Sequence, residues 1–174
     1  MKRPIVIAIL IGVFCVAPIG DLLASYKEED SAAAIALFKE TDLSLEAFFD
    51  SSYGFAVFPK VGKGGIGIGG AHGKGLVYKG DEIVGRTSLT QFTVGLQLGG
   101  QVYQEVIFFE NERSFENFTG GNFELSAQAS AIAAAAGVAA NATYRHGVAI
   151  FTLGKGGLMY EASVGGQKFS FTPL

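Results

Sequence analysis

The stretch FAVFPKVGKGGIGIGGAHGKGLVYKGD, residues 55–81, decides the fold class of this chain. Apolar runs at 55–58 and 76–78 flank a centre in which glycine alternates with other residues. Alternation with a period of two is typical of β-strands, and glycine and proline mark strand ends. The stretch therefore predicts short strands with tight connections: the first stops at Pro59, another runs over 65–69, and a third enters a turn at Lys79-Gly80-Asp81.

The chain that follows continues the strand pattern to residue 174. Segments 90–98 and 102–109 alternate, and Gly99-Gly100 separates them, so we expect the two to pair as a β-hairpin. Residues 111–118 have the spacing of a short helix. The alanine-rich segment 130–140 has a helical composition, although Gly137 and the neighbouring strand patterns oppose a helix. Further strands are expected at 122–129, 148–153, 157–163 and 168–172.

The segment before this strand-rich part, residues 26–50, is acidic and helical. It holds two lysines against seven acidic residues. Asp30 or Ser31 can cap a helix over 32–38, and Ser44 can cap a second, shorter one. Together with the strands, this predicts an α+β fold in which N-terminal helices pack on a strongly bent, barrel-like antiparallel β-sheet.

The first 25 residues have the pattern of a secretory signal peptide. Lys2 and Arg3 precede an uncharged stretch over 5–19, which is too short for a comfortable transmembrane helix. We therefore expect a signal peptide at 1–25, one domain at 26–174, and a periplasmic or secreted protein that can associate peripherally with a membrane. Lipidation at Cys15 is the alternative, which the bulky Phe14 before it disfavours.

Composition and motifs argue against several function classes. A net charge of −3 disfavours nucleic acid, and one cysteine with two histidines is a poor metal set. The G-x-G-x-x-G patterns at 62–67 and 65–70 precede more glycine rather than a helix, which disfavours nucleotide binding. His72 and His146 lack the pattern of a catalytic triad. We therefore expect no enzymatic activity and no cofactor.

A basic block at 60–86 is the candidate binding site. It holds five cationic residues against Asp81 and Glu82. Gly-Lys-Gly-Gly occurs at 62–65 and again at 154–157, and lysines between glycines on β-turns could offer both ammonium and backbone N–H groups to an anionic head group. A solvated strand face is the other interpretation. The candidate lipid-binding residues are Lys60, Lys63, Lys74, Lys79, Arg86 and Lys155.

Four segments in order resemble the SYLF lipid-binding domain: YGFAVFPKVGKGG at 53–65, GLQLGGQ at 95–101, FELSAQAS at 123–130 and GGLMYEAS at 156–163. The resemblance extends from about residue 33 to the C-terminus. It implies a non-enzymatic module that binds phospholipids, with phosphoinositides preferred among eukaryotic members, some of which also bind actin. The expected partner is therefore a phospholipid or an anionic membrane surface.

Two other functions fit part of the pattern. A structural cell-envelope protein could use the basic residues to contact a protein or polysaccharide. An outer-membrane barrel would suit the length and the alternation. The alanine-rich 130–140, the absence of tryptophan and the Pro173-Leu174 terminus argue against the barrel.

Overall fold

The computed structural model describes residues 26–66, 68–94, 99–120, 123–125, 131–132, 139–155, 157–161 and 166–174. The expected signal peptide at 1–25 lies outside these residues, as do most of the alanine-rich segment 130–140 and of the strand expected at 122–129.

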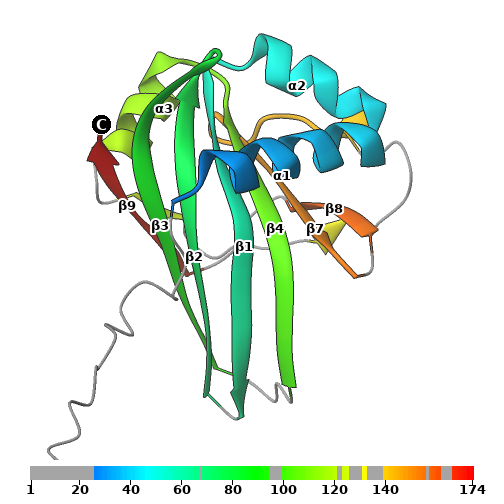
Figure 1. The fold of residues 1–174 in the computed structure, drawn as a ribbon, viewed down its shortest axis with the longest axis vertical. Coiled ribbons are helices and arrows are strands. Elements are labelled where there is room, and N and C mark those ends of the chain that lie inside the picture. Colours follow the sequence, from blue (N-terminus) through cyan, green and yellow to red (C-terminus); the bar gives the residue numbers. More distant parts are fainter. Residues whose placement is uncertain are drawn as a thin grey trace, which may run out of the picture.

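The helices lie at one end of the molecule (Figure 1). Residues 26–51 form α1 (Glu28–Thr41), the 3₁₀ turn η2 (Leu43–Leu45) and α2 (Glu46–Ser51), which confirms the helical N-terminal segment. Their caps differ from the expected ones. Lys27 precedes α1 without a side-chain cap, and Asp42 caps η2 by accepting a 3.0 Å hydrogen bond from the Ser44 N–H. The second Asp42 carboxylate oxygen accepts from the Ala139 N–H at 3.1 Å, which ties the helices to the second 3₁₀ turn, η3 (Ala139–Asn141).

The helix expected at 111–118 is confirmed as α3 (Glu112–Thr119). The Asn111 side chain accepts a 3.0 Å hydrogen bond from the Ser114 N–H and so caps the helix.

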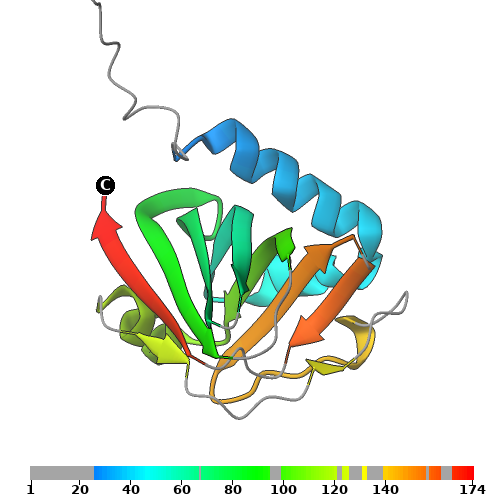
Figure 2. The same cartoon turned by 90° about the horizontal axis from the view of Figure 1, so that it is seen from below.

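One antiparallel sheet holds the nine strands of the described residues, in the order β5-β9-β3-β2-β1-β4-β7-β8-β6. The α+β class is therefore confirmed. The sheet is curved, and β5 and β6 at its two ends both lie on the side away from α1 (Figure 2). The two end strands do not pair with each other, so the sheet is open and only loosely barrel-like. The strands are β1 (Gly54–Ile66), β2 (Ile68–Lys79), β3 (Glu82–Val94), β4 (Gly99–Phe109), β5 (Glu124–Leu125), β6 (Ala131–Ile132), β7 (Val148–Gly154), β8 (Gly157–Glu161) and β9 (Gln167–Pro173).

Three sequence expectations about the strands are wrong. The segment 65–69 is not one strand, because Ile66 of β1 pairs with Ile68 of β2 across a hairpin. The first strand does not stop at Pro59, because β1 continues through a register shift between Val57 and Lys60, where a proline without an N–H is tolerated. Strands β3 and β4 do not form a hairpin, because β4 pairs with β1, an arrangement that depends on distant residues rather than on local alternation.

The two faces of the sheet carry separate cores. On the α1 face, Phe108 packs on Phe48 and Phe49 of α2, with ring centroids 5.4 and 4.8 Å apart. On the α3 face, Phe109 packs on Phe115 and Phe118 of α3 at 5.7 and 4.7 Å. Successive residues of a strand thus serve opposite cores, as the pleat requires. Strands β1 to β4 extend well beyond the helix-covered end (Figure 1), and we call this part the sheet extension: residues 60–66, 68–74, 88–94 and 99–104.

Among the described residues, no helix combines the length and the apolar character that a membrane crossing requires.

Candidate functional site

Two predicted lysines lie opposite each other at the base of the sheet extension. Lys60 of β1 pairs with Lys74 of β2, and Lys74 pairs with Ser88 of β3. Ser88 in turn pairs with Ser170 of β9, and their hydroxyls form a 2.6 Å hydrogen bond. Residues that lie directly opposite in an antiparallel sheet share one face. A polar row with two cations therefore crosses the sheet.

This row lies on the α1 face. Leu76, two residues after Lys74, belongs to the core cluster that α1 and α2 cover. Arg86 pairs directly with Leu76 and so shares this face. Lys60, Lys74 and Arg86 are thus together, just beyond the edge of the helical layer.

The next rows toward the tip combine glycine with exposed apolar residues. His72 pairs with Gly62 of β1, and Gly62 pairs with Val102 of β4. One row further, Phe92 of β3 pairs with Gly70, which pairs with Gly64. Phe92 is 73% exposed and Val102 is 54% exposed. We call this surface the basic face: Lys60, His72, Lys74, Arg86, Phe92 and Val102.

The aromatic ring of Tyr26 lies beside two of the cations. The Lys74 ammonium lies 5.2 Å from the centroid of the Tyr26 ring, and the Arg86 guanidinium lies 5.7 Å from it. Both distances are within the range of cation–π attraction. The Tyr26 ring therefore interacts with both Lys74 and Arg86, which the pairing of β2 with β3 already places near each other.

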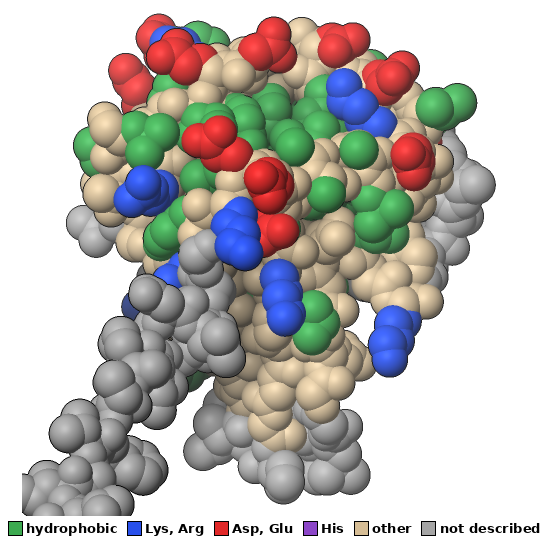
Figure 3. All heavy atoms as spheres, viewed as in Figure 1, with side chains coloured by type: hydrophobic (Ala, Val, Ile, Leu, Met, Phe, Trp, Pro, Cys, Tyr) green, Lys and Arg blue, Asp and Glu red, His purple; other side chains and the backbone are tan. Residues whose placement is uncertain are grey.

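The charges of the two ends differ in sign. The exposed acidic residues of the helices are Glu28, Glu29, Asp30, Glu40, Glu46, Asp50, Glu112 and Glu116. Figure 3 shows red side chains gathered at the helical end, whereas the charged side chains seen below α1 on the sheet are blue. The molecule is dipolar, as the charge blocks of the sequence suggested, with its basic side on the sheet extension.

Three other predicted residues lie elsewhere. Lys63 is two residues after Val61, which belongs to the core on the α3 face, so Lys63 is on the opposite side of the sheet from Lys60. Lys79 lies at the helical end, 4.6 Å from the centroid of Tyr53. Hydrogen bonding to Tyr53 is the main cause that raises the pKa of Lys79, and the charges of Tyr53, Glu112 and Glu116 raise it further. Lys155 is exposed in the turn between β7 and β8.

The expectation of two equivalent Gly-Lys-Gly-Gly turns is wrong. Residues 62–65 lie inside β1, paired on both sides, whereas 154 and 155 lead into the β7–β8 turn. The structure brings Lys60, Lys74 and Arg86 together and separates Lys63, Lys79 and Lys155 from them.

The sequence analysis missed His72, Phe92 and Val102 as parts of this surface. Phe92 was expected in an alternating apolar row, and it is instead highly exposed. The sequence of segment 90–98 does not show this exposure, because strand pairing decides which residue lies beside Phe92. That residue is Gly70, which has no side chain to cover the ring.

A buried polar group lies on the other face of the sheet. Glu105 of β4 and Gln167 of β9 are fully buried, and the Gln167 side-chain N–H donates a 3.0 Å hydrogen bond to the Glu105 carboxylate. Thr152 pairs directly with Glu105 and is also buried. In the part of the chain that the structure describes, no three His, Cys, Asp or Glu residues lie close enough to hold a metal ion.

Comparison with known proteins agrees with the resemblance seen in the sequence. Residues 90–172 match a family model, Ysc84, described as "Las17-binding protein actin regulator". The chain is 31% identical over 140 residues to "Beta cell expansion factor A" of Aeromonas veronii, an alignment that covers 79% of this chain and 52% of the relative. The chain thus spans about half the length of that relative. Residues 90–172 of this chain belong to the Ysc84, or SYLF, domain family.

Proposed function

We propose that this protein is a non-enzymatic module that binds anionic phospholipid surfaces through its basic face. The observation that carries the proposal is the pairing of Lys60 with Lys74 on one face of the sheet extension, with Phe92 and Val102 exposed beside them. Cations next to exposed apolar side chains suit a membrane interface. Anionic head groups attract the cations, and the apolar side chains insert at the boundary of the acyl chains.

The shape of this surface supports contact with a broad, flat partner. Gly62 and Gly64 follow Lys60 on this face of β1 and carry no side chains, and Gly70 lies beyond His72 on β2. A Cβ added at Gly62 would meet no atom within 4 Å, so the surface there is open. A membrane can therefore approach the backbone of β1 closely.

The acidic helical end sets the orientation. Exposed carboxylates on α1, α2 and α3 are repelled by an anionic bilayer, while the sheet extension is attracted. In this proposal the protein is oriented with its helices away from the membrane. The expected signal segment at 1–25 would deliver it to the periplasm or the exterior, where it acts as a peripheral protein.

A second candidate is binding to a protein partner through the same face. The family description, a Las17-binding actin regulator, favours it, since it names a protein as the ligand of a family member. A structural role in the cell envelope, with a protein or polysaccharide partner, belongs to this class.

Vesicle flotation separates the two candidates. The protein should float with phosphatidylcholine vesicles that contain phosphatidylglycerol more than with phosphatidylcholine alone. The difference should shrink with salt, because each lysine near an anionic surface contributes about 1 kcal/mol and is screened within roughly 10 Å at 0.1 M salt. Equal flotation with both vesicles at low salt would reject the membrane proposal and leave the protein partner.

A further inference from the structure

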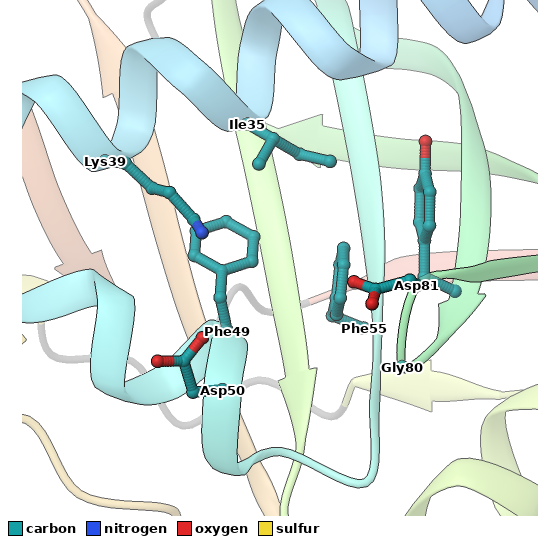
Figure 4. Close-up of a pocket in the computed structure, with 8 residues that line it drawn as sticks. Ile35, Lys39, Phe49, Asp50, Phe55, Gly80 and Asp81 are labelled. Carbon is teal, nitrogen blue, oxygen red and sulfur yellow. The ribbon is translucent and has the colours of Figure 1, made fainter.

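A small pocket lies between the helices and the β2–β3 turn, away from the basic face. Its volume is about 150 Å³, and Figure 4 shows its lining. α1 contributes Ile35 and Lys39, and α2 contributes Phe49 and Asp50. The sheet contributes Phe55, Tyr78, Gly80 and Asp81.

Three aromatic rings form the walls of the pocket. Phe55 and Tyr78 are stacked, with centroids 4.8 Å apart and planes within 8°. Phe49 meets Phe55 edge to face, at 5.1 Å and 88°. The Tyr78 hydroxyl donates a 2.9 Å hydrogen bond to Ser31 in the buried layer under α1, which fixes the ring. The walls are therefore preorganised.

Two carboxylates flank the rings. Asp50 and Asp81 are exposed, and neither carboxylate forms a hydrogen bond or salt bridge within the described part of the chain. The one cation of the lining, Lys39, lies over Phe49 with its ammonium 5.1 Å from the ring centroid. Figure 4 shows Lys39 reaching down from α1 to that ring. The pocket thus carries two negative charges against one positive charge.

We propose that this pocket binds a quaternary ammonium group, such as that of choline. In the free protein the Lys39 ammonium covers the face of the Phe49 ring, and the ligand displaces this ammonium when it binds. Aromatic side chains with nearby carboxylates are the usual way in which proteins recognise such cations. A cavity of about this volume holds a group the size of benzene, which is comparable to a trimethylammonium group. The Lys39 ammonium already demonstrates that the Phe49 ring accepts a cation.

The apolar walls favour a quaternary over a primary ammonium. A primary ammonium carries three N–H donors that must keep partners when water is removed. N-methyl groups have no donors and pack directly on ring faces and on Ile35. Methylammonium should therefore bind more weakly than tetramethylammonium.

Isothermal titration calorimetry with the full chain tests the proposal. Choline chloride and tetramethylammonium chloride are titrated against methylammonium chloride at matched chloride concentration. Saturable binding of the two quaternary ions, and weaker binding of methylammonium, is the expected result. No saturable binding of either quaternary ion, or equal binding of methylammonium, would overturn the proposal.

Three variants separate this binding from non-specific attraction. Lys39→Ala should strengthen choline binding by about two- to fivefold, because it frees a ring face and removes a positive charge. The double variant Asp50→Asn/Asp81→Asn should weaken it by at least a similar factor. Phe49→Leu should abolish it while the far-UV spectrum stays unchanged. Glu40→Gln, which removes an exposed charge next to Lys39 but outside the pocket, is the matched control and should have little effect.

The sign of the Lys39 effect is decisive. A Lys39 that only stabilises α1 would lower or leave unchanged the affinity when removed, and either result would overturn the displacement proposal. Phosphatidylcholine vesicles added as competitor distinguish the sources of the ammonium group: competition indicates a lipid head group, and its absence a free solute. Because these residues are not part of the basic face, Phe49→Leu should leave the extra flotation caused by phosphatidylglycerol unchanged, and this distinguishes a failure of the pocket proposal from a failure of the proposed function.

Discussion

Glu105 on β4 and Gln167 on β9 are joined by a 3.0 Å hydrogen bond, although β3, β2 and β1 separate their strands in the sheet. Neighbouring strands lie about 4.8 Å apart, so a flat sheet would hold these two residues roughly 19 Å from each other. The bond therefore requires the sheet to curl until side chains of β4 and β9 meet. Both side chains are fully buried, so the hydrogen bond also gives each of them a polar partner inside the core on the α3 face.

We expect substitutions of Glu105 and Gln167 to have non-additive effects on the free energy of unfolding. Gln167→Leu removes a donor to a buried carboxylate and should lower the free energy of unfolding by about 1–3 kcal/mol. In a double-mutant cycle with Glu105→Leu, the combined loss should be smaller than the sum of the single losses by about 0.5 kcal/mol or more. Urea unfolding measures all three variants. If the two single losses of unfolding free energy add up to the loss of the double variant, the hydrogen bond does not stabilise the curvature of the sheet.

A glycine in β2 should tolerate no side chain. A Cβ at Gly75 would overlap the Val57 carbonyl oxygen and lie 2.8 Å from Phe58 Cδ1. Gly75→Ala should therefore destabilise the fold by about 1–3 kcal/mol. Gly62→Ala is the control, since a Cβ there meets nothing within 4 Å. Thermal unfolding of the two variants compares them, and an equal loss in both would contradict the close packing of β2 against β1.

How far the sequence could predict the fold depends on the range of the interactions. The helix α3 was predictable, because Asn111 and the spacing of Phe115 and Phe118 act within a few residues. The partner of β4 was not, because alternation in 99–109 fits any neighbouring strand. Pairing with β1 is decided by residues some forty positions earlier in the chain.

The faces on which the candidate lysines lie were also not predictable from local sequence, because they depend on one irregular position in β1. A register shift between Val57 and Lys60 inserts an extra position in β1 and reverses the faces of all residues that follow. Without this irregularity, Lys63 would lie on the α1 face and Lys60 on the other. Pro59 is the only local signal of the shift, and a proline in an apolar run equally predicts the end of a strand.

Alkaline pH should destabilise the protein through Tyr144. Burial, followed by the charge of Glu110, raises the pKa of Tyr144 to about 12 from its usual 10.0. The folded state therefore holds the phenolic proton more tightly than the unfolded state. The resulting stability is complete below pH 10 and is lost as the pH rises toward about 12.

Tyr144→Phe is the direct test of this effect. The variant has no proton to lose at this position, so its free energy of unfolding should fall less steeply than that of the parent above pH 10. Urea titrations at several alkaline pH values measure the slope. Parallel slopes in parent and variant would contradict the raised pKa.

The exposed apolar residues should supply the part of membrane binding that salt does not remove. Phe92→Ser with Val102→Ser should weaken flotation with phosphatidylglycerol-containing vesicles at high salt, by about 1–3 kcal/mol for the pair. Leu43→Ser is the matched control, because Leu43 is 74% exposed but lies at the helical end. If the Leu43 variant loses as much binding as the double variant, the apolar contact is not on the basic face.

The most direct test of the central claim compares two charge reversals of equal size on vesicles of phosphatidylcholine with phosphatidylglycerol. Lys60→Glu/Lys74→Glu alters the basic face, and Lys79→Glu/Arg113→Glu makes the same change in net charge at the helical end. At about 1 kcal/mol per lysine, plus the repulsion of the new carboxylates, the first variant should lose flotation at low salt while the second keeps nearly all of it. Far-UV spectra confirm that both remain folded. Equal losses in the two variants, or undiminished flotation of Lys60→Glu/Lys74→Glu, would contradict binding through the basic face.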